Sequence, residues 1–364
     1  MKKIVVSGIN LFRGGTLKVM RDCLAALSAF AGNDYEIIAL VCNENLYPPY
    51  PNVRYISYPK SRKSYFFRLY YEYAGFKKLS LRLKPYCWFS LHDITPHVVA
   101  EKRVVYCHNP YPFFKPGIRG LFLQRNVFFL CLLSRYLYGI NIRKNDYVVV
   151  QQEWLRQAFR KMFSTDKVVV ALPVSGKKEK TVPGNRNGRK EKVFFYPATA
   201  ILQKNFEVIC KAAALLEKEG IAGFEVILTL EKTDNRYAGS IYAAYHALKT
   251  LNFAGFLPPE AVNACYENSD CLLFPSKAET WGLPVSEAKE YGKPMFLADL
   301  PYARETVGKY DKVCFFDPDD AGQLAALMKN FINGTIVYDE TENICYEQPV
   351  VYNWDELIRF LIKG

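Results

Sequence analysis

Short apolar runs alternate with stretches of helical periodicity along almost the whole chain. The first run, Lys3–Ser7, is typical of a buried strand. The residues after it place apolar side chains at helical spacing, at Leu17, Met20, Leu24, Leu27 and Phe30. Repeated units of this kind predict a parallel sheet with helices on both faces, and therefore an α/β fold.

The same pattern gives the expected elements in chain order. The other expected strands are Tyr35–Cys42, Val53–Tyr58, Cys87–Leu91, Arg103–Cys107, Asp146–Val150, Lys167–Leu172, Val193–Tyr196, Phe224–Leu230, Phe253–Phe256, Cys271–Phe274, Pro294–Ala298 and Val313–Phe316. The expected helices begin with 16–30 and continue with Gly120–Tyr138, Trp154–Met162, Phe206–Glu219, Ser240–Leu251, Glu260–Asn268, a helix from Pro284, Ala321–Phe331 and Trp354–Ile362.

One segment interrupts the alternation. Residues 175–192 are rich in charge, glycine and proline and hold almost no apolar side chain, which indicates a linker or an exposed loop. A chain of 364 residues also exceeds what one hydrophobic core usually holds. We therefore expect a first domain at residues 1–174, a linker at 175–192 and a second domain at 193–351.

The net charge of +12 is unevenly distributed between these halves. Residues 1–172 hold 26 Lys and Arg against 10 Asp and Glu, a surplus of 16, whereas the remainder holds 22 against 26. This asymmetry favours an anionic partner for the first domain alone.

The ten cysteines are scattered and form no Cys-x-x-Cys pair, which is typical of a reducing compartment and excludes a zinc-finger or disulfide framework. The apolar run at the N-terminus is too short for a signal peptide, and no run approaches the length of a membrane span. A cytoplasmic protein is the expectation.

The most informative stretch is Glu279-Thr-Trp-Gly-Leu-Pro-Val-Ser-Glu287. It follows a buried strand, contains a glycine at Gly282, and continues into a helix near Pro284. Strand, glycine loop and helix N-terminus form an anion site, because free N–H groups and the positive end of the helix dipole face one point. Two carboxylates, Glu279 and Glu287, flank this site. A sugar nucleotide fits such a site, because its hydroxyls need acceptors and its diphosphate needs donors.

This stretch resembles the donor-site motif of retaining family-4 glycosyltransferases, which have the GT-B fold: two doubly wound Rossmann-like domains facing a central cleft. The resemblance implies that Glu279 binds hydroxyls of the transferred sugar and acts in catalysis. It also implies that Glu287 holds the ribose, and that the loop at Trp281, Gly282 and Leu283 holds the diphosphate. In such enzymes a C-terminal helix, here within 352–364, packs back on the first domain.

Two further loops fit the resemblance. Gly14 and Gly15 lie between the first strand and first helix, where the family brings a loop close to the donor phosphates. After the strand Val193–Tyr196, the family has an arginine and, five residues later, a lysine that neutralise the diphosphate. Lys204 matches the lysine, whereas Thr199 stands at the arginine position.

Histidines follow two strands of the first domain. His108 lies at the carboxyl end of a parallel strand, where open α/β sheets bind ligands, and the family has a histidine there that faces the acceptor. His92 and Asp93 follow another strand and are a second choice, and the resemblance makes His108 the catalytic candidate.

The sequence Asp317-Pro-Asp319 is comparable to the metal-binding Asp-x-Asp of other glycosyltransferases. It directly precedes a helix, so helix capping explains it better. No other carboxylate cluster is near enough in sequence to complete an octahedral site. We therefore expect metal-independent catalysis, with no cofactor and a nucleotide sugar as substrate.

The resemblance implies transfer of a sugar from a nucleotide-sugar donor to an acceptor hydroxyl with retention of configuration. A saccharide or lipid-linked saccharide in bacterial surface polysaccharide (O-antigen or capsule) synthesis is the expected acceptor. A GT-B nucleotide-sugar epimerase and a non-catalytic sugar-binding scaffold are the alternatives.

The segment from Arg62 to Lys84 interleaves aromatic rings with Lys and Arg. This combination suits the interface of an anionic membrane, because one end of each ring can contact the acyl chains while the other faces the hydrated headgroups. We expect peripheral attachment to the inner face of the plasma membrane. The alternative is that the rings belong to the core. No nucleic-acid-binding motif accompanies the charges, so nucleic acid is not an expected partner.

Overall fold

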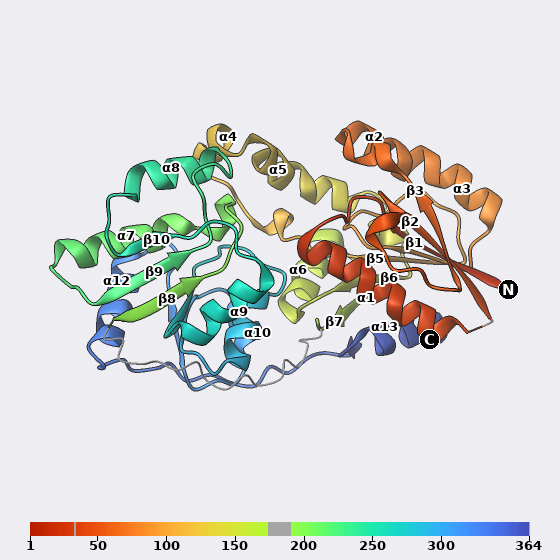
Figure 1. Ribbon diagram of the computed structural model, residues 1–364. Helices are drawn as coiled ribbons and strands as arrows, with labels where there is room; N and C mark the ends of the chain where they lie inside the picture. Colours follow the sequence, from red (N-terminus) through yellow and green to blue (C-terminus); the bar gives the residue numbers. More distant parts are fainter. Residues whose placement is uncertain (33, 174–190, 364) are drawn as a thin grey trace. The chain divides into compact units, whose positions relative to one another are not determined.

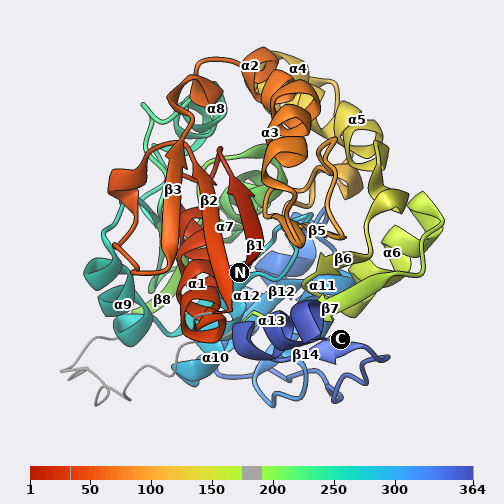
Figure 2. The same ribbon diagram turned by 90° about the vertical axis from the view of Figure 1, so that its right-hand side faces the viewer.

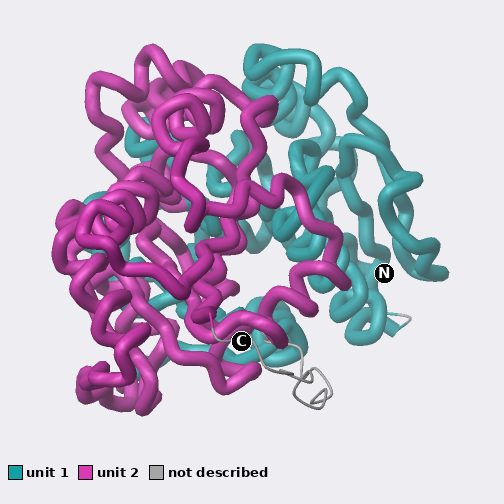
Figure 3. Tube along the Cα trace, turned by 60° about the vertical axis from the view of Figure 1, so that its left-hand side comes forward, with its two compact units in different colours: residues 1–109, 134–174, 346–364 teal, residues 110–133, 175–345 magenta. Residues whose placement is uncertain are grey.

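The computed structural model describes residues 1–32, 34–173 and 191–363, which divide into two compact units. Unit 1 comprises residues 1–109, 134–174 and 346–364, and unit 2 comprises residues 110–133 and 175–345 (Figure 3). Most of the expected linker, 175–192, lies outside the described residues. Residues 110–133, which the sequence analysis placed in the first domain, belong to unit 2.

Unit 1 is built on a sheet of eight strands, ordered β14-β7-β6-β5-β4-β1-β2-β3, with every neighbouring pair parallel. Its strands are β1 (Lys2–Gly8), β2 (Tyr35–Val41), β3 (Val53–Ser57), β4 (Cys87–Ser90), β5 (Lys102–Tyr106), β6 (Tyr147–Val150), β7 (Val168–Ala171) and β14 (Val350–Val351). Its helices are α1 (Gly14–Ala31), α2 (Tyr65–Tyr70), a π-helical turn (Tyr71–Gly75), α3 (Phe76–Leu83), α6 (Glu153–Phe163) and α13 (Trp354–Lys363).

Helices cover both faces of this sheet, and the alternation of side chains along β1 explains how. Ile4 and Val6 face α1 and α13, whereas Val5 faces Phe76 and other residues of α3 on the opposite side. Figure 2 shows α1 and α13 side by side on their face of the sheet. Both faces of the sheet are therefore buried, which is why the sequences of these strands are continuous apolar runs.

Unit 2 has a six-stranded parallel sheet ordered β10-β9-β8-β11-β12-β13. Its strands are β8 (Lys192–Tyr196), β9 (Phe224–Leu228), β10 (Leu251–Phe253), β11 (Cys271–Phe274), β12 (Met295–Ala298) and β13 (Val313–Phe316). Its helices are α4 (Arg119–Leu123), α7 (Phe206–Lys218), α8 (Arg236–Tyr245), α9 (Pro259–Asn268), α10 (Leu283–Glu290), α11 (Pro301–Val307) and α12 (Ala321–Ile332), and α5 (Arg125–Gly139) begins in it (Figure 1).

Several elements differ from the sequence-based expectation: helices α2, α3 and α11 were not expected, and three further differences have a clear cause or consequence. The single helix expected at Gly120–Tyr138 is two helices, α4 and α5, which are separated at Gln124. Helix α8 begins at Arg236 because the side chain of Asn235 caps it, accepting from the N–H of Tyr237 at 3.0 Å. Strand β14, which was not expected, pairs with β7 at the edge of the first sheet, just before α13.

The ten cysteines are all free thiols, and Cys345 is the exposed one. Among the helices described here, none combines the length and apolar character that crossing a bilayer requires.

Candidate functional site

The strand order of unit 2 places two loops at one point of the sheet edge. Strand β8 lies between β9 and β11, so the chain leaves β8 toward one side and later builds the other side outward from β11. Ligands of open α/β sheets bind at such a switch, beyond the carboxyl ends of the strands. The loops here are 197–205 after β8 and 275–282 after β11.

These two loops bring Lys204 and Glu279 together. The ammonium group of Lys204 forms an ion pair with the Glu279 carboxylate, and the side chains are only 17% and 13% exposed. The hydroxyl of Tyr196, from β8, donates to the carbonyl of Lys204 at 2.6 Å and lies 3.2 Å from the hydroxyl of Ser276. Tyr196 thus ties both loops to the sheet.

Gly282 makes the turn that leads into α10. Its φ of +87° lies in the left-handed region, and a Cβ there would come within 3.2 Å of the Phe274 ring. Only glycine fits this position without strain. Helix α10 begins at the next residue, Leu283, so its unpaired N–H groups start directly at the turn.

Neighbouring side chains hold this turn in place. The indole of Trp281 donates to the hydroxyl of Ser286 at 2.9 Å, and the hydroxyl of Thr306 donates to the carbonyl of Trp281. The Tyr302 hydroxyl donates to the carbonyl of Ser276 at 2.6 Å. Burial raises the pKa of Tyr302 well above its usual value, so the phenol remains a donor.

Glu287 lies on the first turns of α10, where it accepts a hydrogen bond from the hydroxyl of Tyr266 at 2.9 Å. Tyr266 is buried, and burial raises the pKa of its phenol well above the usual value. The phenol therefore stays protonated and fixes the orientation of the carboxylate. Tyr266 could not be recognised from the sequence, because a tyrosine at the end of an amphipathic helix carries no separate signal.

Thr199 does not join this group. It lies exposed in the loop after β8, and its carbonyl accepts from the N–H of Ile201 at 2.8 Å. Lys204 is therefore the cation that the loop presents next to Glu279.

The remaining predicted residues lie in unit 1, at the carboxyl ends of β1 and β5. Gly14 has a φ of +57° and starts α1, and both Gly14 and Gly15 have open space where a Cβ would stand. Asp93 holds the loop after β5: its carboxylate accepts from the N–H of His108 at 2.7 Å and of Asn109 at 3.0 Å. Burial lowers the pKa of His108, so its ring is neutral at neutral pH.

His92, the second choice among the histidines, does not face a ligand site. It is fully buried, and its two ring nitrogens contact the carboxylate of Glu72 and the carbonyl of Ser7. Glu72 itself is buried in the π-helical turn between α2 and α3. The His92 ring therefore has a structural role, because it pins that turn to the sheet.

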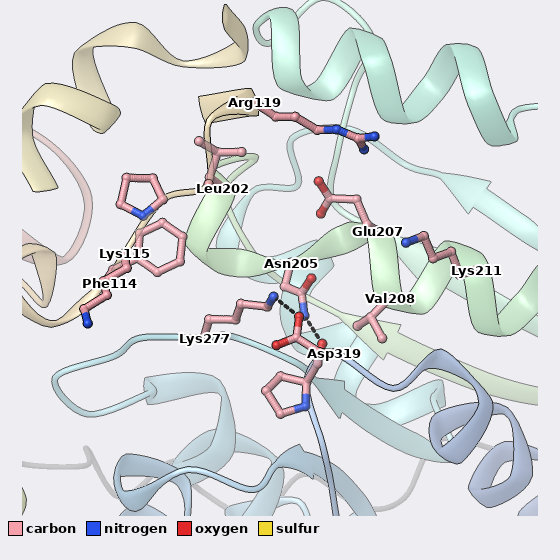
Figure 4. A pocket seen from close by; sticks show the side chains of 13 residues that line it. Phe114, Lys115, Arg119, Leu202, Asn205, Glu207, Val208, Lys211, Lys277 and Asp319 are labelled. Carbon is pink, nitrogen blue, oxygen red and sulfur yellow. Dashed lines mark hydrogen bonds and ion pairs between the residues drawn. The ribbon is translucent and has the colours of Figure 1, made fainter. Parts of the chain in front are cut away.

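The Asp317-Pro-Asp319 sequence has two structural roles. Asp317 accepts from the N–H of Asp319 at 2.8 Å, and Asp319 forms an ion pair with Lys277 beside Asn205 (Figure 4). The cap of α12 is the next residue, Asp320, and not either predicted aspartate. The described residues contain no group of three or more His, Cys, Asp or Glu side chains placed to share a metal ion.

A hollow of about 280 Å³ surrounds this ion pair within unit 2. Figure 4 shows the side chains that line it. Its polar lining holds four cations and two carboxylates: Lys115, Arg119, Lys211, Lys277, Glu207 and Asp319. Neither Lys204 nor Glu279 lines it, so it is separate from the pair at the switch point.

Gly282→Ala tests the turn. We expect a loss of order 1–3 kcal/mol in the free energy of unfolding, because a side chain is strained at this φ and meets Phe274. Gly117→Ala is the control, since Gly117 has an ordinary φ and open space around it. Thermal unfolding of both variants measures the difference, and equal stability would contradict the strained geometry.

Part of the sequence matches a known protein family and a curated relative. Residues 177–348 match the model of the family described as glycosyl transferases group 1. The chain is 24% identical over 165 residues to the serotype-specific mannosyltransferase WbdA of Escherichia coli, a match that covers 44% of this chain but only 20% of WbdA. This chain therefore spans about a fifth of that relative.

Two solved structures share the fold. WaaG, a glycosyltransferase involved in lipopolysaccharide biosynthesis, has a TM-score of 0.66 at 13% identity, covering 99% of this chain and 95% of its own. HepE of Anabaena, solved in complex with UDP and glucose, has a TM-score of 0.62 at 13% identity, covering 92% and 89%.

Proposed function

We propose that this protein transfers a sugar from a nucleotide-sugar donor to an acceptor hydroxyl. The premise is that residues 177–348 match the glycosyl transferases group 1 and that the chain has the GT-B fold. The observation that carries the proposal is the Lys204–Glu279 pair, held at the switch point of the second sheet beside the N-terminus of α10. This combination offers a cation and free amides for a diphosphate, and a carboxylate for sugar hydroxyls.

Donor binding would rearrange this pair. The incoming diphosphate competes with Glu279 for the ammonium group of Lys204, since both are anions that accept charge-assisted hydrogen bonds. Once Lys204 contacts the diphosphate, the Glu279 carboxylate is released to accept hydrogen bonds from the sugar. Glu287, oriented by Tyr266, accepts from the ribose hydroxyls.

In the reaction the bond between the anomeric carbon and the diphosphate breaks, and negative charge develops on the leaving oxygen. Lys204 and the N–H groups of α10 stabilise that charge. We propose retention, with the departing diphosphate taking the acceptor proton on the same face and no side chain acting as nucleophile. In this proposal Gly14 and Gly15 approach the donor phosphates, and neutral His108 faces the anomeric carbon and the acceptor.

The reaction should proceed without a divalent metal, because Lys204 and the helix N-terminus supply the positive charge that a metal ion would bring. We expect an unchanged transfer rate in excess EDTA, measured as nucleoside diphosphate release. An enzyme that EDTA silences and that Mg²⁺ or Mn²⁺ restores would contradict this prediction.

For the acceptor we propose a saccharide or lipid-linked saccharide of bacterial surface polysaccharide synthesis, at the inner face of the plasma membrane. The similarity to WbdA and WaaG supports this choice. The segment 62–84 supports a membrane location, because Tyr65, Phe66 and Tyr70 of α2 are exposed, Phe66 by 75%. Phe76, in contrast, belongs to the core, so the interpretation of the segment as core holds only for its second half.

Attachment through this segment should depend on its charges. Replacing Lys77, Lys78, Arg82 and Lys84 by Gln removes four exposed cations, each worth about 1 kcal/mol near an anionic surface. Flotation with anionic liposomes should weaken strongly, and high salt should have the same effect on the parent protein. The same exchange at Lys218, Lys249, Lys309 and Lys312, exposed lysines of unit 2, is the charge-matched control. Equal flotation of both variants would contradict the assignment.

The proposed function is tested by incubating the protein with a panel of nucleotide sugars, chosen first by thermal shift because a bound donor stabilises the folded state. We expect nucleoside diphosphate release that depends on an acceptor, and NMR of the product should show the anomeric configuration of the donor. Conversion of the donor alone would indicate an epimerase. Binding without any turnover would indicate a sugar-binding scaffold.

A further inference from the structure

Helices α4 and α5 leave a set of large apolar side chains without a covering element in unit 2. Ile118 is 69% exposed, Phe122 70% and Leu132 57%, and Phe129 and Leu133 are also exposed. Phe129, Leu132 and Leu133 share one face of α5, because their spacing of three and four residues is that of a helix face. We call these five residues the apolar strip.

The strip is not a loosely attached surface, because the other side of the same segment is fixed. Gly120 is buried, and a Cβ there would come within 3.0 Å of the Leu202 side chain. At the break between the helices, the amide of Gln124 donates to the carbonyl of Ala200 at 2.8 Å and accepts from the N–H of Leu202 at 2.9 Å. The apolar side chains therefore point outward from a well-held scaffold.

The charges around the strip indicate what covers it. Residues 102–145 contain eight Lys and Arg and no Asp or Glu. Within unit 2, Lys115, Arg119 and Arg125 flank the strip and are exposed, and the guanidinium of Arg125 lies 5.7 Å from the Phe129 ring centroid. Apolar side chains that insert, flanked by cations on a stretch of chain that holds no carboxylate of its own, fit the boundary between acyl chains and anionic headgroups.

We propose that the apolar strip on α4 and α5 inserts into an anionic phospholipid bilayer. This surface is additional to the basic segment of α2 and α3, and either attachment can fail without the other. Because Gln124 binds the loop that leads to Lys204, the inserted helices would hold that loop at a fixed distance from the lipid surface. An acceptor anchored in the same bilayer would then meet the donor loop at a defined height.

Depth-dependent fluorescence quenching in the full-length protein tests the insertion directly. Phe122→Trp should be quenched by bromine-labelled acyl chains in vesicles of phosphatidylglycerol and phosphatidylcholine, after subtraction of the parent protein's signal. Phe256→Trp is the matched control, since Phe256 is also highly exposed, at 84%, elsewhere in unit 2. Equal quenching at both positions, or none at Phe122→Trp, would overturn the proposal.

A second pair of variants separates insertion from loss of fold. Leu132→Ser with Leu133→Ser should lower the vesicle partition coefficient at least tenfold with an unchanged melting temperature, whereas Phe256→Ser with Val337→Ser should leave it unchanged. Tyr65→Ser with Phe66→Ser should not reduce the quenching of Phe122→Trp.

Light scattering identifies the competing occupant: a dimer that the Leu132 and Leu133 substitutions dissociate, without vesicle binding, would assign the strip to a second copy of this chain. No donor or acceptor is needed, so the result is independent of catalysis.

Discussion

Glu279→Ala is expected to reduce sugar transfer about 10²–10³-fold, while nucleoside diphosphate binding persists. The carboxylate is assigned to hydroxyls of the transferred sugar, which the nucleoside diphosphate lacks. Its removal also frees Lys204 from the ion pair, so the diphosphate loses no contact. Initial rates give the first quantity, and isothermal titration with nucleoside diphosphate gives the second.

Glu287→Ala provides the contrast on the same motif. Losing a charged hydrogen-bond acceptor for the ribose costs about 1.5–3 kcal/mol, so nucleotide affinity itself should fall roughly 10–150-fold. Glu340→Ala, an exposed carboxylate of unit 2, should change neither quantity. If Glu279→Ala weakens nucleotide binding more than Glu287→Ala does, the two assignments are wrong.

Lys204→Ala is expected to impair both donor binding and turnover. The ammonium group contacts the diphosphate in the ground state and again as negative charge develops on the leaving oxygen, so we expect a loss of about 10²–10³-fold in kcat/KM. Titration should show that the affinity for nucleoside diphosphate approaches that for the nucleoside alone, since the missing contact is to phosphate.

Two controls accompany this measurement. Lys218→Ala removes an exposed lysine near the other end of α7 and should leave the affinity unchanged. The double variant Lys204→Ala with Glu279→Ala separates a direct contact from the effect of an unpaired carboxylate. If the double variant binds nucleoside diphosphate as tightly as the parent, Lys204 does not contact the diphosphate.

The strands and the strand–loop–helix geometry around residues 279–287 could be predicted from the sequence because they depend on local patterns. Expected and observed strands agree to within about one or two residues at most ends: Cys271–Phe274, for example, is β11 as expected. The turn at Gly282 and the helix start after it also follow from local chemistry, since a left-handed turn before a helix favours glycine.

Features that depend on tertiary contacts could not be predicted. The break at Gln124 exists because its side chain binds the backbone of residues 200–202, far away in sequence. Glu72 reads as one acid in a basic segment, and only the fold shows that it pairs with His92. Strand β14 is two residues long, too short for any periodicity.

In the candidate site, too, individual residues could be predicted from the sequence but their contacts could not. Lys204 and Glu279 were expected from separate motifs, but their ion pair follows from the strand order of unit 2. Tyr196, Tyr266 and Tyr302 orient the site residues through hydroxyl groups, and a tyrosine within an apolar run looks the same whether or not its hydroxyl has such a partner.

The return of residues 346–364 to unit 1 constrains the order in which the chain can mature. Strand β14 completes the first sheet, and Leu357, Ile358 and Leu361 of α13 fill its core against α1. Proteins are synthesised from the N-terminus, and domains usually complete folding in that order. Here the unit whose synthesis begins first is completed last, because its core stays open until β14 and α13 have been synthesised. Until then the apolar face that α13 covers stays exposed, and a stop between unit 2 and α13 would leave unit 2 complete beside an unfinished unit 1.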